Sequence, residues 1–126
     1  MGMVYAKIKL SNPRKPDLRS IEVTSLVDSG AIHLCIPEAI AFQLELDTHE
    51  FRNVQTADEK IHSLPYVGPI RVDFENRFCF VGAMVIGNET LLGAISMEDM
   101  DLIIHPSRQT LNVNLMSPNK PFYKIK

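Results

Sequence analysis

Apolar residues occupy every second position from Val4 to Leu10, with lysines and a tyrosine between them. This period of two is typical of a strand that buries one face. A loop rich in proline and charge, residues 11–19, separates this strand from a second one over residues 21–27, which is rich in β-branched side chains. The second strand ends abruptly at residues 28–30, where a polar turn replaces the apolar run. The pattern therefore predicts a hairpin followed by a turn.

The pattern then changes briefly from strand to helix and back. Residues 31–36 are a short apolar segment, and Pro37 lies in the first turn of a helix predicted over residues 38–44. Two strands are predicted over residues 51–56 and 61–67. The polar residues between these two strands predict a second hairpin with a polar tip.

The last third of the chain predicts further strands and one more helix. Gly68-Pro69 predicts a break, which is followed by strands over residues 70–74 and 78–86. Ser96 and Asp99 have the spacing of a capping box and predict a helical turn or two that runs through Met100. A final strand is predicted over residues 110–115. The chain is thus expected to fold as a mostly β domain with two short helices.

Length and composition favour one globular domain. At 126 residues the chain is close to the size of a single domain, about 150 residues. We expect that domain to span residues 1–126, with its core over about 4–115 and a polar tail over 116–126. The chain is 45% hydrophobic, which is enough for a packed core. Its 13 basic residues are outnumbered by 15 acidic ones, so we expect no nucleic-acid partner.

The sequence predicts neither a membrane segment nor a metal site. The longest nearly apolar run, residues 81–87, is far shorter than the roughly 20 residues that span a bilayer. Because no basic segment followed by an apolar one begins the chain, we expect a cytoplasmic protein. The histidines and cysteines are scattered without zinc-type spacing, so no metal or other cofactor is expected. Cys35 and Cys79 both lie in apolar runs and are expected to be buried thiols.

The candidate chemistry lies in Asp28-Ser29-Gly30. Alone, this tripeptide is a weak signal, since Asp, Ser and Gly favour turns for local reasons, and a purely structural turn stays a possible interpretation. The flanking chain strengthens it. Residues 26–31 read Leu-Val-Asp-Ser-Gly-Ala, and residues 91–94 read Leu-Leu-Gly-Ala before a predicted helix.

These two segments together resemble the retropepsin-like aspartic proteases, a family of single-lobed enzymes that includes the retroviral proteases. In that family a hairpin, an Asp-(Thr/Ser)-Gly-Ala turn, a flap hairpin, further strands, an apolar-apolar-Gly segment before a helix and a terminal strand follow in this order. The chain has each of these elements in order from Val4 to Leu115. The resemblance implies a closed acid-protease β-barrel with one or two short helices.

The resemblance also implies roles for individual residues. Asp28 is expected to be the catalytic aspartate, Ser29 to brace the site across a subunit interface, and Gly30 to let the backbone approach the partner loop. Two carboxylates in contact cannot both ionise, so such a pair holds one proton between them. One carboxylate then takes a proton from a water that attacks the peptide carbonyl, and the other protonates the carbonyl oxygen. Neither a covalent intermediate nor a metal is required.

Since the chain contains Asp-Ser-Gly only once, the second carboxylate has to come from another copy. A symmetric homodimer follows, in which Asp28 lies near its symmetry mate. The resemblance implies that the terminal strand pairs between subunits, although this strand could instead close the sheet of one subunit. A peptide or protein substrate is expected along Ala31 and the tip of the flap, which comprises Ala57, Asp58, Glu59, Lys60 and Ile61.

One other interpretation of the same fold stays open. The expected flap, residues 55–62, contains no glycine, whereas the flaps of active relatives usually do. A catalytically silent dimer of the same fold, which binds peptides or serves as an assembly module, is therefore the main alternative. A serine nucleophile at Ser29 with His33 as base is disfavoured, because nothing further in the sequence indicates a triad.

Overall fold

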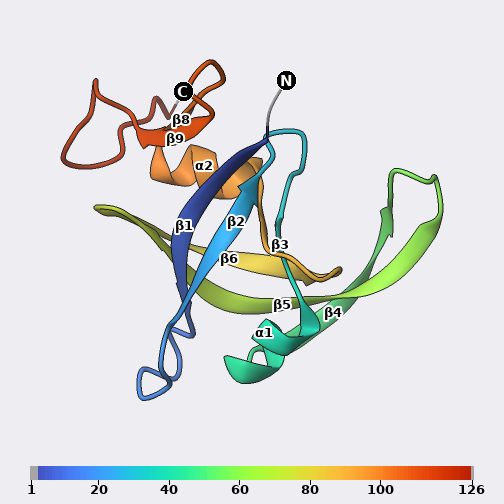
Figure 1. Ribbon diagram of the computed structural model, residues 1–126. Helices are drawn as coiled ribbons and strands as arrows, with labels where there is room; N and C mark the ends of the chain where they lie inside the picture. The colour runs from blue at the N-terminus through green and yellow to red at the C-terminus, as the bar shows by residue number, and fades with distance from the viewer. Residues whose placement is uncertain (1–2, 126) are drawn as a thin grey trace.

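In the computed structural model, which describes residues 3–125, the strands wrap around one apolar interior (Figure 1). The nine strands are β1 Val4–Ser11, β2 Ile21–Val27, β3 Leu34–Ile36, β4 Asp47–Gln55, β5 Ile61–Phe74, β6 Arg77–Val85, β7 Leu91–Leu92, β8 Leu102–His105 and β9 Thr110–Val113. The two helices are α1 Glu38–Gln43 and α2 Ala94–Met100. The mostly β fold with two short helices is therefore confirmed.

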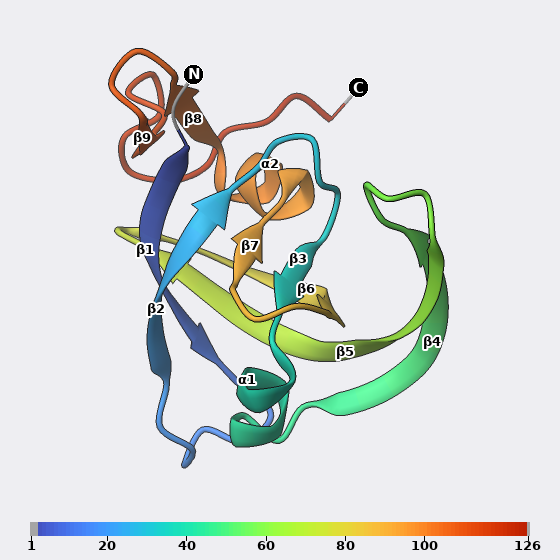
Figure 2. The same ribbon diagram turned by 45° about the vertical axis from the view of Figure 1, so that its right-hand side comes forward.

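Six strands close into a barrel. The seven-stranded sheet has the order β1-β2-β7-β3-β6-β5-β4, and β1 also pairs with β5, so the strands from β1 to β5 in this order form a ring. β4 pairs only with β5 and arches away from the barrel with it, so that the hairpin tip rises toward the level of α2 (Figure 2). Within the barrel, β2 pairs with β7 and β3 pairs with β6 in parallel. These parallel pairs bring residues far apart in the sequence to one end of the barrel.

Alternation along the strands places the core. In β1 the residues at even positions are buried and those at odd positions are exposed, as the sequence pattern predicts. Leu10, Ile70 and Val72 are completely buried where β1 meets β5 and closes the barrel. Burial of such side chains stabilises the fold by about 1.5–3 kcal/mol each.

Two predicted strand boundaries are wrong. β4 begins at Asp47, four residues before the predicted start, because its first part pairs with β5 although its side chains are exposed. Gly68-Pro69 does not end a strand, since β5 runs through it with a register irregularity between Val67 and Ile70. Pro69 has no N–H to give to a sheet ladder, and the irregularity accommodates it without breaking the strand.

The predicted capping box is also wrong. α2 begins at Ala94 with Gly93 as its N-cap, so Ser96 lies inside the helix, where its side chain is buried. Its hydroxyl has no hydrogen-bond partner among the described residues. The helix over residues 38–44 is confirmed as α1, with Pro37 at its N-cap.

The C-terminal segment forms a small sheet of its own. β9 pairs with β8 in an antiparallel two-stranded sheet, so within one subunit it does not close the barrel, contrary to that interpretation of the sequence. The buried Arg77 donates to the carbonyl of Met100, 3.0 Å away, and to that of Ser117. Asp101 accepts hydrogen bonds from Asn114 and Ser117. These contacts hold the start of the tail against the end of α2.

Within residues 3–125, no helix is long and apolar enough to cross a membrane.

Candidate functional site

Backbone hydrogen bonds fix the position of Asp28. Leu26 and Val27 at the end of β2 pair in parallel with Leu91 and Leu92 of β7. The Asp28 N–H donates to the Leu92 carbonyl at 3.0 Å, and the Ala31 N–H donates to the Asp28 carbonyl at 3.2 Å. The turn therefore starts where the two strands end, and the Asp28 side chain is exposed at that end of the barrel.

The Asp28 side chain is oriented by its own turn. One carboxylate oxygen, Oδ1, accepts a hydrogen bond of 2.9 Å from the Gly30 N–H. Asp side chains commonly bond to the backbone two residues on in this way. The bond fixes Oδ1 on the turn, and no hydrogen bond to the other carboxylate oxygen is found among the described residues.

The Asp28 turn also caps α2. The first N–H groups of a helix have no partners inside it. Here the Ala94 N–H donates to the Ala31 carbonyl at 2.8 Å, and the Ile95 N–H donates to the Ile32 carbonyl at 3.1 Å. These two bonds join the turn that carries Asp28 to the start of α2.

Gly93 is required for this contact. A Cβ at position 93 would lie 2.6 Å from the His33 carbonyl oxygen, 2.8 Å from that of Ile32 and 2.9 Å from that of Ala31. No side chain fits so close to three backbone oxygens. The glycine of the apolar-apolar-Gly segment therefore allows α2 to approach the Asp28 turn.

A cleft of about 600 Å³ opens beside Asp28. Asp28, Gly30, Ala31 and Cys35 line one wall. The end of the β4–β5 hairpin contributes Gln55, Thr56 and Ala57. The rest of the lining comes from the β6–β7 connection, residues 86–89, and from Leu91, which pairs with Cys35 in the sheet. The three segments come from separate parts of the chain, and Asp28 lies where a bound molecule would meet all of them.

Four of the predicted site residues meet at this cleft: Asp28, Gly30, Ala31 and Ala57. Ser29 is exposed in the turn but does not line the cleft. Asp58, Glu59, Lys60 and Ile61 are exposed at the hairpin tip, beyond the lining residues. The hairpin therefore reaches the cleft through Ala57 and the two residues that precede it.

Sequence reasoning did not name Cys35, Gln55, Thr56, Leu91 or residues 86–89 as site residues, although all of them line the cleft. Residues 86–89 read as an ordinary turn, and only their place between two apolar segments could have indicated a role. Cys35 was expected to be buried, yet it is only half-buried and faces the cleft, because β3 presents one face to the interior and the other to the cleft. Cys79, by contrast, is buried as expected.

The environment of Cys35 keeps its thiol neutral. Burial raises the pKa of Cys35, and the nearby charge of Asp28 raises it further. A neutral thiol is a weak nucleophile, and the other acidic side chains that line the cleft are the carboxylates of Asp28 and Glu89. Among the described residues, no three His, Cys, Asp or Glu side chains lie close enough together to hold a metal ion.

The tip of the β4–β5 hairpin turns tightly without glycine. The Glu59 N–H donates to the Thr56 carbonyl at 2.9 Å, and the Thr56 N–H donates to the Lys60 carbonyl at 3.1 Å. Glu59 itself has a left-handed backbone, with φ of 66°. This is the three-residue hairpin loop in which glycine usually takes the left-handed position. Glu59 thus takes the left-handed position that glycine usually occupies in such a loop.

Side chains reinforce this tip. The Asp58 carboxylate accepts hydrogen bonds from the Thr56 hydroxyl and from the Lys60 N–H. The Thr56 hydroxyl, followed by the Lys60 N–H, lowers the pKa of Asp58. The Gln55 side chain donates to the Glu59 carbonyl at 3.1 Å. The tip is therefore held in one shape by side chains of its own loop.

The closed barrel, the parallel pairing of β2 with β7, and the hairpin that contributes to the cleft define a retropepsin-like fold. The sequence matches no protein-family model and no curated protein. Among solved structures, the chain is similar to the retroviral protease-like domain of Ddi1 from Leishmania major, with 14% identity, a TM-score of 0.60, and coverage of 98% of this chain and 96% of that one. It is also similar to the simian foamy virus (mac) protease, with 15% identity, a TM-score of 0.50, and coverage of 74% of this chain and 90% of that one. The fold predicted from the resemblance is confirmed.

Proposed function

We propose that this protein is an aspartic endopeptidase in which Asp28 from each of two identical subunits activates a water molecule. The observation that carries the proposal is the placement of Asp28: its backbone is fixed by β7 and its carboxylate lies at a cleft below a hairpin. The similar structures are retroviral protease-like, which supports the same class of chemistry for this chain.

The second carboxylate of the pair comes from a second copy. Ile32 and Ile95 lie beside each other at the Asp28 turn, because the Ile95 N–H bonds to the Ile32 carbonyl. Both are large apolar side chains, yet Ile32 is 64% exposed and Ile95 is 42% exposed. Apolar residues exposed together favour a surface that another protein covers. A symmetric dimer at this face buries them and sets the two Asp28 side chains against each other.

In the dimer the two carboxylates share one proton and titrate as a unit. The ionised carboxylate removes a proton from water, and the protonated one stabilises the oxygen of the attacked carbonyl. The substrate is an extended peptide, because a hairpin edge binds a strand through backbone groups and reads its side chains on alternating sides. Residues 86–89 and Cys35 then contact substrate side chains.

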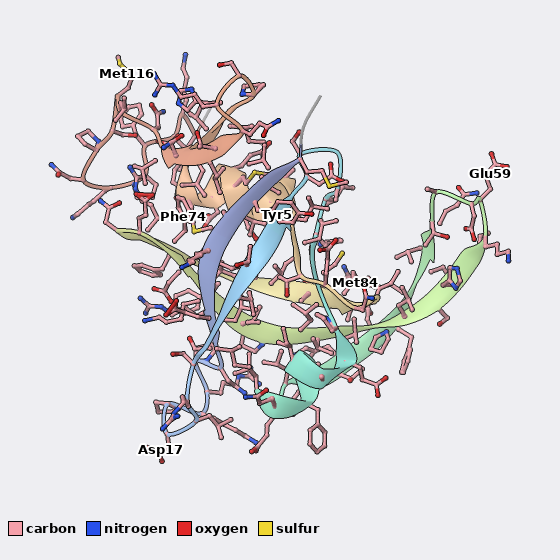
Figure 3. All side chains as sticks on the ribbon, in the orientation of Figure 1. Tyr5, Asp17, Glu59, Phe74, Met84 and Met116 are labelled. Carbon is pink, nitrogen blue, oxygen red and sulfur yellow. The ribbon has the colours of Figure 1, made fainter. Side chains whose placement is uncertain are left out.

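The proposal is tested by incubating a diverse peptide library with the wild type, Asp28→Asn and Asp17→Asn at acidic to neutral pH. Asp17 is an exposed carboxylate in the β1–β2 loop, far from the hairpin tip (Figure 3), so its variant is a matched control. We expect the wild type and Asp17→Asn to cleave the same bonds and Asp28→Asn to cleave none. Equal cleavage by all three proteins would refute the role of Asp28.

Light scattering at micromolar concentration tests the dimer. The expected mass is twice 14.2 kDa. A mass of 14.2 kDa at every concentration would contradict the shared pair of carboxylates.

The second candidate function is a silent dimer that binds peptides without cleaving them. The hydrogen bonds of Gln55, Thr56 and Asp58, which hold the hairpin tip in one shape, favour it. Peptides that bind the dimer and are recovered intact from both the wild type and Asp28→Asn would support this function over the enzyme.

A further inference from the structure

Tyr66 joins three segments of the chain at the base of the hairpin. The guanidinium carbon of Arg52, on β4, lies 3.7 Å from the centre of the Tyr66 ring. The ring of His33, in the segment between the Asp28 turn and β3, lies 5.8 Å from the Tyr66 ring at an angle of 63°. Both arrangements are attractive, the first as a cation–π contact and the second as an edge-to-face pair. We call Arg52, Tyr66 and His33 the Tyr66 stack.

The Tyr66 ring packs directly against the backbone of the barrel. It lies over Gly82 of β6, where a Cβ would come within 2.1 Å of the Tyr66 hydroxyl oxygen and 2.2 Å of the adjacent ring carbon. Any residue other than glycine would therefore displace the ring. Glycine within a strand costs stability and often marks the close approach of another group. Here that group is the Tyr66 ring.

The two ends of the Tyr66 stack lead to two different segments that line the cleft. Arg52 lies three residues before Gln55 on the same hairpin strand, and Gln55 lines the cleft. His33 follows the carbonyls of Ala31 and Ile32 that cap α2, and it precedes Cys35, which also lines the cleft. The stack is thus a side-chain connection between the hairpin and the Asp28 turn.

Charges around the stack are consistent with close packing. Burial lowers the pKa of His33, and the positive charge of Arg52 lowers it further. Arg52 is held by Glu50, 2.6 Å away, and this hydrogen bond raises the pKa of Arg52. A neutral His33 can pack its ring edge against Tyr66 without repelling Arg52.

We infer that Tyr66 is a positioning residue that sets the height of the β4–β5 hairpin over Asp28. This inference rests on the proposed function, because it assigns the hairpin to substrate binding. Loss of the Tyr66 ring leaves the Asp28 turn intact through its backbone bonds to β7 and α2. The same loss frees the hairpin, which holds the substrate. Peptide binding is therefore weakened more than the rate of the chemical step.

The test compares Tyr66→Leu with Phe78→Leu. Phe78 is a matched control, since it is a half-exposed aromatic residue on β6 with the guanidinium carbon of Arg71 4.2 Å from its ring centre. We expect Tyr66→Leu to raise KM about tenfold, equivalent to about 1.4 kcal/mol, and to change kcat less than about threefold. Tyr66→Phe keeps the ring and is expected to restore the wild-type KM. Phe78→Leu is expected to leave both constants unchanged.

Two measurements need no activity. Hydrogen exchange of the amides in residues 31–34 and 53–61 is expected to be about tenfold faster in Tyr66→Leu, and unchanged in Phe78→Leu. The NMR titration of His33 is expected to shift upward toward the ordinary histidine pKa of 6.5 in Tyr66→Leu and in Arg52→Gln. A His33→Gln sample identifies the His33 resonance among the 4 histidines.

The outcomes separate this inference from the proposed function. If no protein cleaves any peptide, the proposed function fails, and exchange and titration still decide the role of Tyr66. Wild-type exchange and an unshifted His33 titration in Tyr66→Leu would overturn the inference even if cleavage is found. Should Tyr66→Leu fail to fold, Arg52→Gln removes the cation from the Tyr66 ring, and wild-type amide exchange in residues 53–61 of that variant would also overturn the inference.

Discussion

The left-handed backbone of Glu59 gives the most direct test of the hairpin tip. A non-glycine residue in this region costs about 1–2 kcal/mol, which Glu59→Gly removes. Glycine in turn loses about 0.4–1 kcal/mol more entropy than other residues when the chain folds. The net effect is a stabilisation of about 0.5–1 kcal/mol. For a chain of 126 residues this raises Tm by about 2–4 °C.

The assay is thermal unfolding followed by circular dichroism, with every variant at the same concentration because Tm depends on concentration in a dimer. Glu59→Ala removes the same exposed side chain but keeps the left-handed penalty, so its Tm should not rise. Glu75→Gly, in the β5–β6 turn where φ is 50°, relieves the same kind of strain elsewhere and should raise Tm similarly. An equal rise in Glu59→Ala would refute the reasoning, since the side chain and not the backbone would then limit stability.

Two further perturbations address the frame around Asp28 and the tail. Gly93→Ala places a methyl group against three carbonyl oxygens. It should lower the free energy of unfolding, measured in urea, by at least about 2 kcal/mol. An unchanged urea midpoint would mean that α2 does not pack this closely on the Asp28 turn. Hydrogen bonds from Ser117, from the Phe122 N–H and from Asn114 lower the pKa of Asp101 below its ordinary value of 3.8. Because the folded pKa is the lower one, this stabilisation is complete above pH 3.8 and is lost as the pH falls below it. Amide exchange in the tail should therefore accelerate below pH 3.8 in the wild type but show no such step in Asp101→Asn, and a step in both would contradict the assignment.

The sequence predicted the parts of this protein that depend on local patterns. Alternation from Val4 to Leu10 was enough to identify β1 and its buried face, and the end of an apolar strand at Asp28 was enough to find the turn at the cleft. What it could not predict depends on contacts between distant segments. The start of α2 is set by carbonyls of the Asp28 turn, so the local capping signal at Ser96 was misleading.

The same reason explains the residues that were missed at the cleft. Cys35 lies in an apolar run, but which face of β3 is covered depends on its pairing with both β6 and β7. The Tyr66 stack was also invisible, because Arg52, Tyr66 and His33 have no shared spacing in the sequence. Only the register of β4, β5 and β6 brings Arg52 and Gly82 to the same ring.

The hydrogen bonds that hold the Asp28 turn in place are formed almost entirely by main-chain atoms. The bonds from Asp28 to Leu92, from Ala94 to Ala31 and from Ile95 to Ile32 use amides and carbonyls that nearly every residue type supplies. Such a set of bonds tolerates many different side chains, provided that position 93 is glycine. A chain that is 14% identical to the Leishmania major domain can therefore have a similar fold, with a TM-score of 0.60. For proteins of this kind, two chains can share the course of the backbone while sharing few of their side chains.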